Sequence, residues 1–227
     1  MKNHFELKLE QILDSRSQMH KKNVERLVRY FGHKSKSSYD GAQFETYENS
    51  VKNTNHLVAA DFVAVTFLSM EIRRSSRSGI TPNQIQRITE QNQKISRLLK
   101  RIPDNEELHS LSNRRFDQIM GDYSPSHELW KMLRDKETLA LPRIATFKLL
   151  ARKRPLLFPI ADSYVEHALG RQTNWWKSWH ATLSTREDLV GELKKLRTNS
   201  SKLVNEIKNL SLIRVADIVI WDSQRNP

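Results

Sequence analysis

Apolar residues recur every three to four positions along most of the chain, which is the spacing of one face of an α-helix. Residues 1–31 predict one or two amphipathic helices that stop at Gly32. A longer helix is predicted from Thr81-Pro82, a favourable N-cap and first-turn pair, to about Lys100. Shorter helices are expected at 126–134 and at 187–199. The chain therefore has the pattern of a helical protein.

Two segments are too apolar for surface helices. Residues 57–72 are apolar nearly all round, which predicts a buried helix. Asp61 lies near the start of this segment, where a negative charge in the first turn stabilises a helix. The alternative is that Asp61 lines a pocket. Residues 210–221, LSLIRVADIVIW, are apolar and rich in β-branched side chains, so periodicity does not separate a strand from a buried helix. Because no second convincing strand is present to pair with it, we expect a helix.

These elements predict an all-α fold. A chain of 227 residues is long enough for one all-helical core, or for two helical lobes with a cleft between them. The sequence has no internal repeat, no low-complexity tract and no clean boundary. We therefore expect one compact domain over 1–227, in which 1–135 and 136–227 are candidate lobes.

The charge balance points to an anionic partner. The net charge is +12 and the pI about 9.9, which favours nucleic acid or an anionic surface, although a merely basic protein is the plain alternative. There is no cysteine, so disulfides, cysteine-ligated zinc and an iron–sulfur cluster are excluded. The histidines are scattered without metal-ligand spacing, and we expect no metal and no cofactor.

No apolar run approaches the roughly 20 residues that span a bilayer, so no membrane partner is expected. The first residues, MKNHFELKLEQ, have no apolar signal core. A cytoplasmic protein is the resulting expectation.

The stretch from 139 to 165 forms one pattern. A turn around Pro142 begins a helix, and Pro155 closes it because proline cannot continue the hydrogen-bond ladder. A short apolar segment then leads to Asp162. The helix carries a dense group of cations, namely Lys148, Arg152, Lys153 and Arg154. Such a group beside one acid indicates a site that meets a polyanion. The alternatives are a solvated helix end and, for Asp162, an N-cap of the next helix.

At these residues the chain resembles known proteins. The chain resembles an uncharacterised bacterial family of unknown function in four motifs, which are KLLARKRP, Pro-x-x-Asp, Trp-Trp and LSLIRVADIVIW. Two further motifs, YDGAQFE and DFVAVTFLSM, extend the similarity over most of the chain. The stretch 139–165 also resembles the catalytic core of helix-hairpin-helix DNA glycosylases. The resemblance lies in the order of its parts, which are a turn, a helix, a proline, a short apolar segment and then Asp-Ser-Tyr-Val. The absence of cysteine restricts that resemblance to the branches without an iron–sulfur cluster.

The glycosylase resemblance implies roles for particular residues. Asp162 takes the place of the catalytic carboxylate, which stabilises an oxocarbenium-like transition state and orients the attacking water. The base must be flipped out of the stack into an aromatic pocket. Its candidate walls are Tyr39, Phe44, Tyr164, Trp175, Trp176 and Trp179. Packing in the core or under a loop is the other explanation of these rings. The candidate phosphate contacts are Arg143, Lys148, Arg152, Lys153 and Arg154.

The chain departs from the glycosylase pattern in two ways. The hairpin turn, Leu-Pro-Arg-Ile-Ala, has no glycine, so side chains rather than backbone amides are expected to hold DNA. The position of the Schiff-base lysine of bifunctional members falls on Phe147 or on Ile144, according to the register. We therefore expect a monomeric, monofunctional enzyme that acts on double-stranded DNA and leaves an abasic site.

The target base is not specified by the sequence. The departures from the pattern suggest a hypermodified base of phage DNA, and hence a role in antiviral defence. The alternatives are a catalytically inactive DNA-binding protein that keeps the glycosylase-like fold, or a protein that binds RNA or a tRNA end.

Overall fold

The computed structural model describes residues 3–32, 39–48, 54–73 and 79–226. Within these ranges the regular secondary structure is helical, and the sole β feature is an isolated bridge between Ile72 and Ile80. The predicted all-α class is thereby confirmed. The chain forms two compact units, each described by itself. Unit 1 contains Met1–Tyr39, Glu107–Ser110 and Pro159–Pro227, and unit 2 contains Asp40–Glu106 and Leu111–Phe158. The units are therefore discontinuous in sequence, unlike the candidate lobes 1–135 and 136–227.

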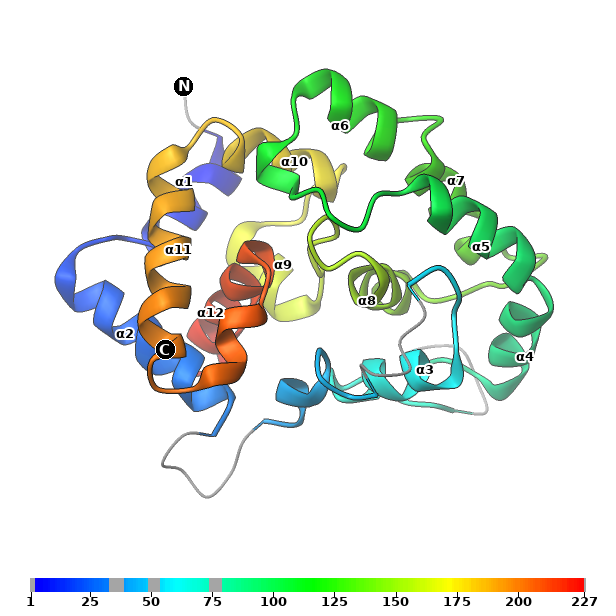
Figure 1. Ribbon diagram of the computed structural model, residues 1–227, viewed down its shortest axis with the longest axis horizontal. Coiled ribbons are helices and arrows are strands. Elements are labelled where there is room, and N and C mark those ends of the chain that lie inside the picture. Colours follow the sequence, from blue (N-terminus) through cyan, green and yellow to red (C-terminus); the bar gives the residue numbers. More distant parts are fainter. Residues whose placement is uncertain (1–2, 33–38, 49–53, 74–78, 227) are drawn as a thin grey trace. The chain divides into compact units, whose positions relative to one another are not determined.

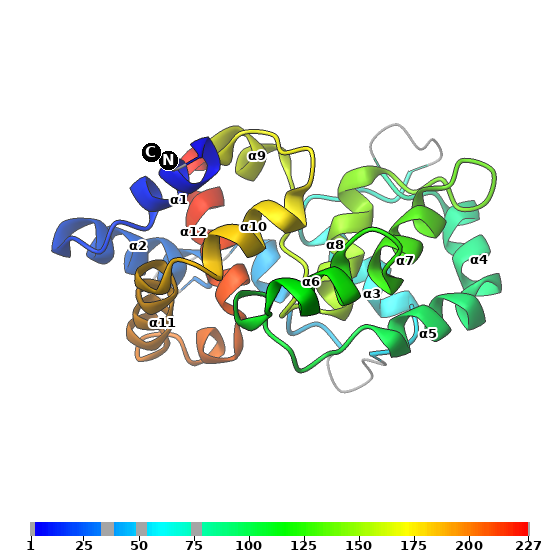
Figure 2. The same ribbon diagram turned by 90° about the horizontal axis from the view of Figure 1, so that it is seen from above.

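Unit 1 is organised around its last helix, which is drawn in red in Figures 1 and 2. Its elements are α1 (His4–Ile12), α2 (Ser17–Tyr30), η3 (Leu108–Ser110), α9 (Ser163–Leu169), α10 (Trp175–Leu183), α11 (Glu187–Ser201), η4 (Asn205–Asn209) and α12 (Leu212–Arg225). Helix α12 packs against α9, α2, α11 and α1, which explains why its sequence is so apolar.

The helical prediction for 210–221 is confirmed. Ser211 caps α12 by accepting a hydrogen bond from the amide of Arg214, 3.2 Å away. Every residue from 212 to 220 is buried. The two buried charges in that run are satisfied internally, because Arg214 pairs with Asp217 and donates to the hydroxyl of Tyr30 at 2.9 Å. A helix surrounded by other helices needs no strand partner.

Unit 2 is built around α8 (Arg143–Lys153). Its other elements are η1 (Asp40–Gln43), α3 (Ala59–Thr66), α4 (Pro82–Glu90), α5 (Asn92–Arg101), α6 (Asn113–Met120) and α7 (Pro125–Arg134). Helices α3 and α7 both pack on α8, and α7 also packs on α5 and α6. Unit 2 therefore places α8 at its centre.

Two predicted helices have different lengths in the structure. The segment 57–72 is helical only as α3, and the carbonyl of Leu68 just beyond it accepts a hydrogen bond from Lys148 at 2.6 Å. The helix predicted from Thr81 to Lys100 is broken between α4 and α5. The side chain of Asn92 at this break bonds both the amide and the carbonyl of Leu57, at 3.1 and 2.8 Å. These partners are distant in sequence, so the apolar spacing did not reveal them.

Candidate functional site

Four of the five predicted phosphate contacts lie in the interior of unit 2. Lys148, Arg152, Lys153 and Arg154 are 1–4% exposed. A phosphate contact and a solvated helix end both require these side chains to reach the surface, whereas every residue of α8 from Ala145 to Lys153 is buried. Cations on such a helix must be satisfied by protein groups, and they have no surface with which to contact a phosphate in this conformation.

Arg154 shows how completely these charges are used inside the unit. Its guanidinium donates to the carbonyls of Ile102 at 2.7 Å and Thr54 at 2.6 Å, and also to the carbonyl of Leu99. It further donates to the side-chain oxygen of Asn55 at 2.9 Å. Two of these carbonyls, those of Leu99 and Ile102, lie at the C-terminal end of α5, where backbone oxygens lack the amide donors of a following helical turn. Arg154 therefore works as a cap for α5.

Lys153 and Arg152 converge on one buried carboxylate. The ammonium group of Lys153 pairs with Asp61, and the Nε atom of Arg152 lies 3.6 Å from the same carboxylate. Arg152 also donates to the backbone carbonyls of Phe44 and Tyr47. Burial lowers the pKa of the Lys153 ammonium, while the charge of Asp61 acts in the opposite direction. Asp61 does lie in the first turn of α3, and its role there is to hold two cations of α8.

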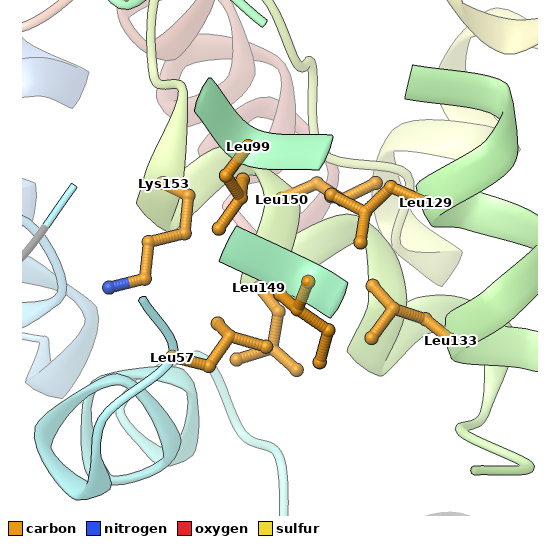
Figure 3. A pocket seen from close by; sticks show the side chains of 8 residues that line it. Leu57, Leu99, Leu129, Leu133, Leu149, Leu150 and Lys153 are labelled. Atoms are coloured by element: carbon orange, nitrogen blue, oxygen red, sulfur yellow. The ribbon is translucent and has the colours of Figure 1, made fainter. Parts of the chain in front are cut away.

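A group of leucine and isoleucine side chains beside Lys153 forms part of the packed core of unit 2. The side chains come from α5, α7, α8 and the segment before α3, and they converge as Figure 3 shows. They are Leu57, Ile95, Leu99, Leu129, Leu133, Leu149 and Leu150. The space between them has no room for a water molecule, so it does not accommodate a base. In Figure 3 the ammonium end of Lys153 is turned away from Leu129 and Leu133.

The three neighbouring tryptophans form part of the core of unit 1. Trp175, Trp176 and Trp179 are at most 6% exposed. Phe5 on α1 meets Trp175 and Trp179 edge to face, at centroid distances of 5.8 and 5.5 Å. These indoles therefore pack in the core in the present conformation, as the alternative to a base pocket predicted. Phe44, in unit 2, is likewise buried.

Tyr39 and Tyr164, in contrast, share a partly exposed site on unit 1. Both rings contact Trp221 of α12, at 5.1 and 6.1 Å between centroids. The guanidinium of Arg225 lies 5.1 Å from the ring centres of both Tyr39 and Trp221. Neither Trp221 nor Arg225 was singled out from the sequence. The sequence could have indicated this pair, because a spacing of four residues puts Trp221 and Arg225 on one face of a helix.

Asp162 is the N-cap of α9. One carboxylate oxygen accepts a hydrogen bond from the amide of Val165 at 3.0 Å, which confirms the capping alternative. The side chain is half-buried, and within the described part of the chain no further partner is found for its other oxygen. The catalytic role of Asp162 stays a prediction.

The turn between α7 and α8 immediately precedes Leu-Pro-Arg-Ile-Ala, the hairpin turn predicted at 141–145. Its backbone amides at 138, 139 and 140 all point to the carbonyl of Asp135. Ala140 has φ +49°, a left-handed conformation that favours glycine. The carbonyl of Ala140 accepts a hydrogen bond from Gln84 at 2.7 Å, and Arg87 donates to the carbonyl of Thr138 at 3.0 Å. Helix α4 thus fixes a strained turn that lacks glycine.

Two arginines flank this turn and lie on one aromatic pair. Arg143, the first residue of α8, has its guanidinium 4.8 Å from the ring centre of Phe147. Arg134, the last residue of α7, lies 5.6 Å from the ring centre of Trp130. The rings of Trp130 and Phe147 are only 4.6 Å apart. Of the five predicted phosphate contacts, Arg143 alone is not buried.

The charge of Arg143 acts on the guanidinium of Arg134. Burial lowers the pKa of the Arg134 guanidinium, and the nearby charge of Arg143 lowers it further. Arg134 also donates to the carbonyl of Leu141 at 3.3 Å, which fixes its position beside the turn. Like charges held together destabilise one another, and an anion that contacts both relieves that repulsion. We define Arg134, Arg143, Trp130 and Phe147 as the hairpin site.

Among the described residues, no group of three or more His, Asp or Glu side chains is placed to hold a metal ion. In the part of the chain that the structure covers, none of the helices combines the length and the apolarity needed to cross a membrane.

Comparison with known proteins identifies the family. The family model described as "Family of unknown function (DUF6308)" matches residues 23–224, and the chain belongs to this family. This agrees with the resemblance to an uncharacterised family that the sequence suggested. No curated protein and no solved structure matches the chain. The similarity to DNA glycosylases stays a prediction.

Proposed function

We propose that the protein binds nucleic acid and that the hairpin site holds backbone phosphates. The observation that carries this proposal is the placement of Arg134 and Arg143 together on one aromatic pair. Paired guanidinium groups match phosphate geometry, because each offers several N–H donors in a fixed plane. The net charge of +12 supplies the long-range attraction that brings a polyanion to such a site.

Two carboxylates of the hairpin, those of Glu128 and Asp135, have partners other than Arg134. Glu128 of α7 accepts a hydrogen bond from Arg101 at 3.1 Å. The carboxylate of Asp135 accepts from the hydroxyl of Thr138 at 2.8 Å and from the amide of Glu137 at 3.3 Å. These contacts hold negative charge within the turn and α5 rather than on Arg134. A phosphate is therefore a suitable counter-ion for Arg134.

The test is DNA binding by a variant that lacks both guanidinium groups. We expect Arg134→Gln/Arg143→Gln to weaken binding of a labelled duplex by about tenfold or more, measured by fluorescence anisotropy. The slope of log affinity against log salt should fall by about 2, since each lost phosphate contact contributes about 0.9. Arg97→Gln/Lys100→Gln is the matched control, because it removes two exposed cations from α5 of the same unit. An equal loss in both variants would show that net charge, not the hairpin, sets the affinity.

A second candidate function is base excision by a monofunctional DNA glycosylase. It is supported by the free carboxylate oxygen of Asp162 and by the position of Tyr164 in the same first turn of α9. A carboxylate there would stabilise positive charge on the sugar and orient the attacking water. Schiff-base chemistry is not expected, because the hairpin offers Phe147 or Ile144 in place of a lysine. Bases of damaged DNA and hypermodified bases of phage DNA are the proposed targets.

Asparagine at position 162 separates catalysis from capping, because Asn caps a helix about as well as Asp. Wild type and Asp162→Asn should be incubated with genomic DNAs that carry different modified bases, and abasic sites quantified. A monofunctional glycosylase is supported if wild type releases a base and Asp162→Asn does not, while both proteins bind DNA equally. Strand breaks should then appear only after alkali treatment. Equal release by both proteins would exclude Asp162 as the catalytic acid.

A further inference from the structure

Trp221 is the centre of an aromatic cluster on unit 1. Its ring lies 5.7 Å from that of Tyr30 and 5.1 Å from that of Tyr39, with interplanar angles of 88° and 81°. Tyr164 approaches from α9 at 6.1 Å and 71°. Rings at these angles meet edge to face, so none of these three pairs is stacked in parallel. The cluster joins side chains from α2, α9, α12 and the segment just before η1.

This cluster is open to solvent, unlike the tryptophans of α10. Tyr164 is 44% exposed, while Tyr39 and Trp221 are half-buried. Three neighbouring aromatic side chains are thus partly exposed on one unit. An exposed apolar surface of this kind, with polar groups around it, is typical of a binding site.

A cation lies over the cluster. Arg225 is exposed, and its guanidinium lies over Tyr39 and Trp221. In the part of the chain that the structure describes, no carboxylate is paired with Arg225. The nearest acid on its helix, Asp222, is fully buried and is engaged by Arg29 and by Arg26.

The cluster is held in place by hydrogen bonds below it. The side-chain amide of Asn226 donates to the hydroxyl of Tyr39 at 3.1 Å and to the carboxylate of Asp222 at 2.9 Å. Asp222 in turn accepts from Arg29 on α2. The rings are therefore positioned before any ligand binds, which reduces the conformational entropy that binding would cost.

We propose that Tyr164, Trp221 and Arg225 form a site for an unpaired nucleobase of single-stranded nucleic acid. A base stacks on the exposed aromatic surface, and Arg225 contacts its face or the adjoining phosphate. The inference rests on the proposed nucleic-acid binding and adds a base-binding site on unit 1, separate from the phosphate contacts of the hairpin site. Stacking tolerates every base, so no strong sequence preference is expected.

The first test uses a ten-nucleotide single strand that carries 2-aminopurine, whose fluorescence is quenched when it stacks. We expect wild type to quench it. Tyr164→Ala and Arg225→Gln should each weaken binding by about tenfold, in the range measured for the loss of one stacked base. Tyr164→Phe keeps the ring and should bind like wild type. Tyr123→Ala is the matched control, because Tyr123 is 88% exposed but belongs to unit 2. Unchanged affinity in Tyr164→Ala overturns the proposal.

A second strand of the same length, with abasic residues in place of bases, separates stacking from phosphate contact. Wild type should bind it about as weakly as Tyr164→Ala binds the normal strand. Equal affinity of wild type for both strands overturns the proposal but leaves the hairpin site intact. Loss of duplex binding in Arg134→Gln/Arg143→Gln, with quenching retained, supports two separate sites. No binding of any strand or duplex by wild type would overturn both proposals.

Discussion

The ammonium group of Lys153 and the carboxylate of Asp61 form an ion pair in the interior of unit 2, where each side chain is only 1% exposed. The pair joins α8 to α3, and Arg152 approaches the same carboxylate. Removing one partner of such a pair leaves a buried charge without compensation, which costs about 3–5 kcal/mol. Asp61 is the shared partner of two cations, so its loss should be the more damaging.

We therefore expect Asp61→Asn to lower the free energy of unfolding by more than Lys153→Met, which leaves Asp61 beside Arg152. The double variant Asp61→Asn/Lys153→Met should be less destabilised than the sum of the two single changes. Urea denaturation of the three variants measures these differences. Additive effects would show that the two groups do not interact.

Ala140 carries strain that a glycine would relieve. Its φ of +49° costs a residue with a Cβ about 1 kcal/mol or more, while glycine adds some entropy to the unfolded chain. We expect Ala140→Gly to raise the free energy of unfolding by about 0.5–1 kcal/mol. Ala181→Gly is the control, because Ala181 lies within α10 and glycine should cost about 1 kcal/mol there. A loss of stability in both variants would contradict strain at Ala140.

His109 should make unit 1 sensitive to mild acid. Burial lowers the pKa of its imidazole, and the charges of Lys194 and Arg197 add to this effect, while Glu107 opposes it. The unfolded chain therefore takes up the proton first, so stability falls as the pH drops from the ordinary histidine pKa of about 6.5 to the lower folded value. Below that folded pKa the loss is complete.

The measurement is chemical denaturation at a series of pH values between about 7.5 and 5. We expect His109→Gln to show a smaller fall in stability over this range than wild type. His167→Gln is the control, because His167 is an exposed residue of α9 in the same unit. An identical pH profile for wild type and His109→Gln would rule out this source of acid sensitivity.

Trp179 tests whether the buried tryptophans have a role in binding. Its indole is 0% exposed and packs edge to face on Phe5. We expect Trp179→Ala to cost about 3–5 kcal/mol of stability, as for other large core residues. Trp179→Phe should remain folded and bind duplex and single-stranded DNA like wild type. Weaker binding by a folded Trp179→Phe protein would support the prediction that these rings line a base pocket.

Much of the fold was predictable because helices follow local patterns. The ends of α7 and α8, the Thr81 cap and the helical character of α12 were all available from apolar spacing, prolines and capping residues. The burial of α8 was not. A helix that mixes cations with apolar residues has the pattern of a surface helix. The backbone carbonyls that bind Arg152 and Arg154 come from 44–47, 54 and 99–102, and no local signal indicates them.

The candidate sites divide in the same way. Tyr39, Tyr164 and Arg143 were singled out because of their residue type and their place near turns or helix starts. Trp221 was included in a core segment, since it ends the largely apolar run LSLIRVADIVIW. Arg134 was assigned simply to the end of a short helix, and only the three-dimensional structure brings it beside Arg143. Residue chemistry thus indicated single participants, whereas their grouping depends on tertiary packing.

The discontinuity of unit 1 has a consequence for synthesis on the ribosome. All residues of unit 2 have been translated once Phe158 is added, so this unit is able to fold during elongation. Helices α1 and α2 are made before unit 2, yet α12, the main partner of α2, begins only at Leu212, and α9, the main partner of α1, begins only at Ser163. Their apolar faces therefore stay unpacked during most of translation and are exposed to chaperones and proteases. A nascent chain stopped before Leu212 should therefore contain a folded unit 2 and an unprotected, readily degraded N-terminal segment.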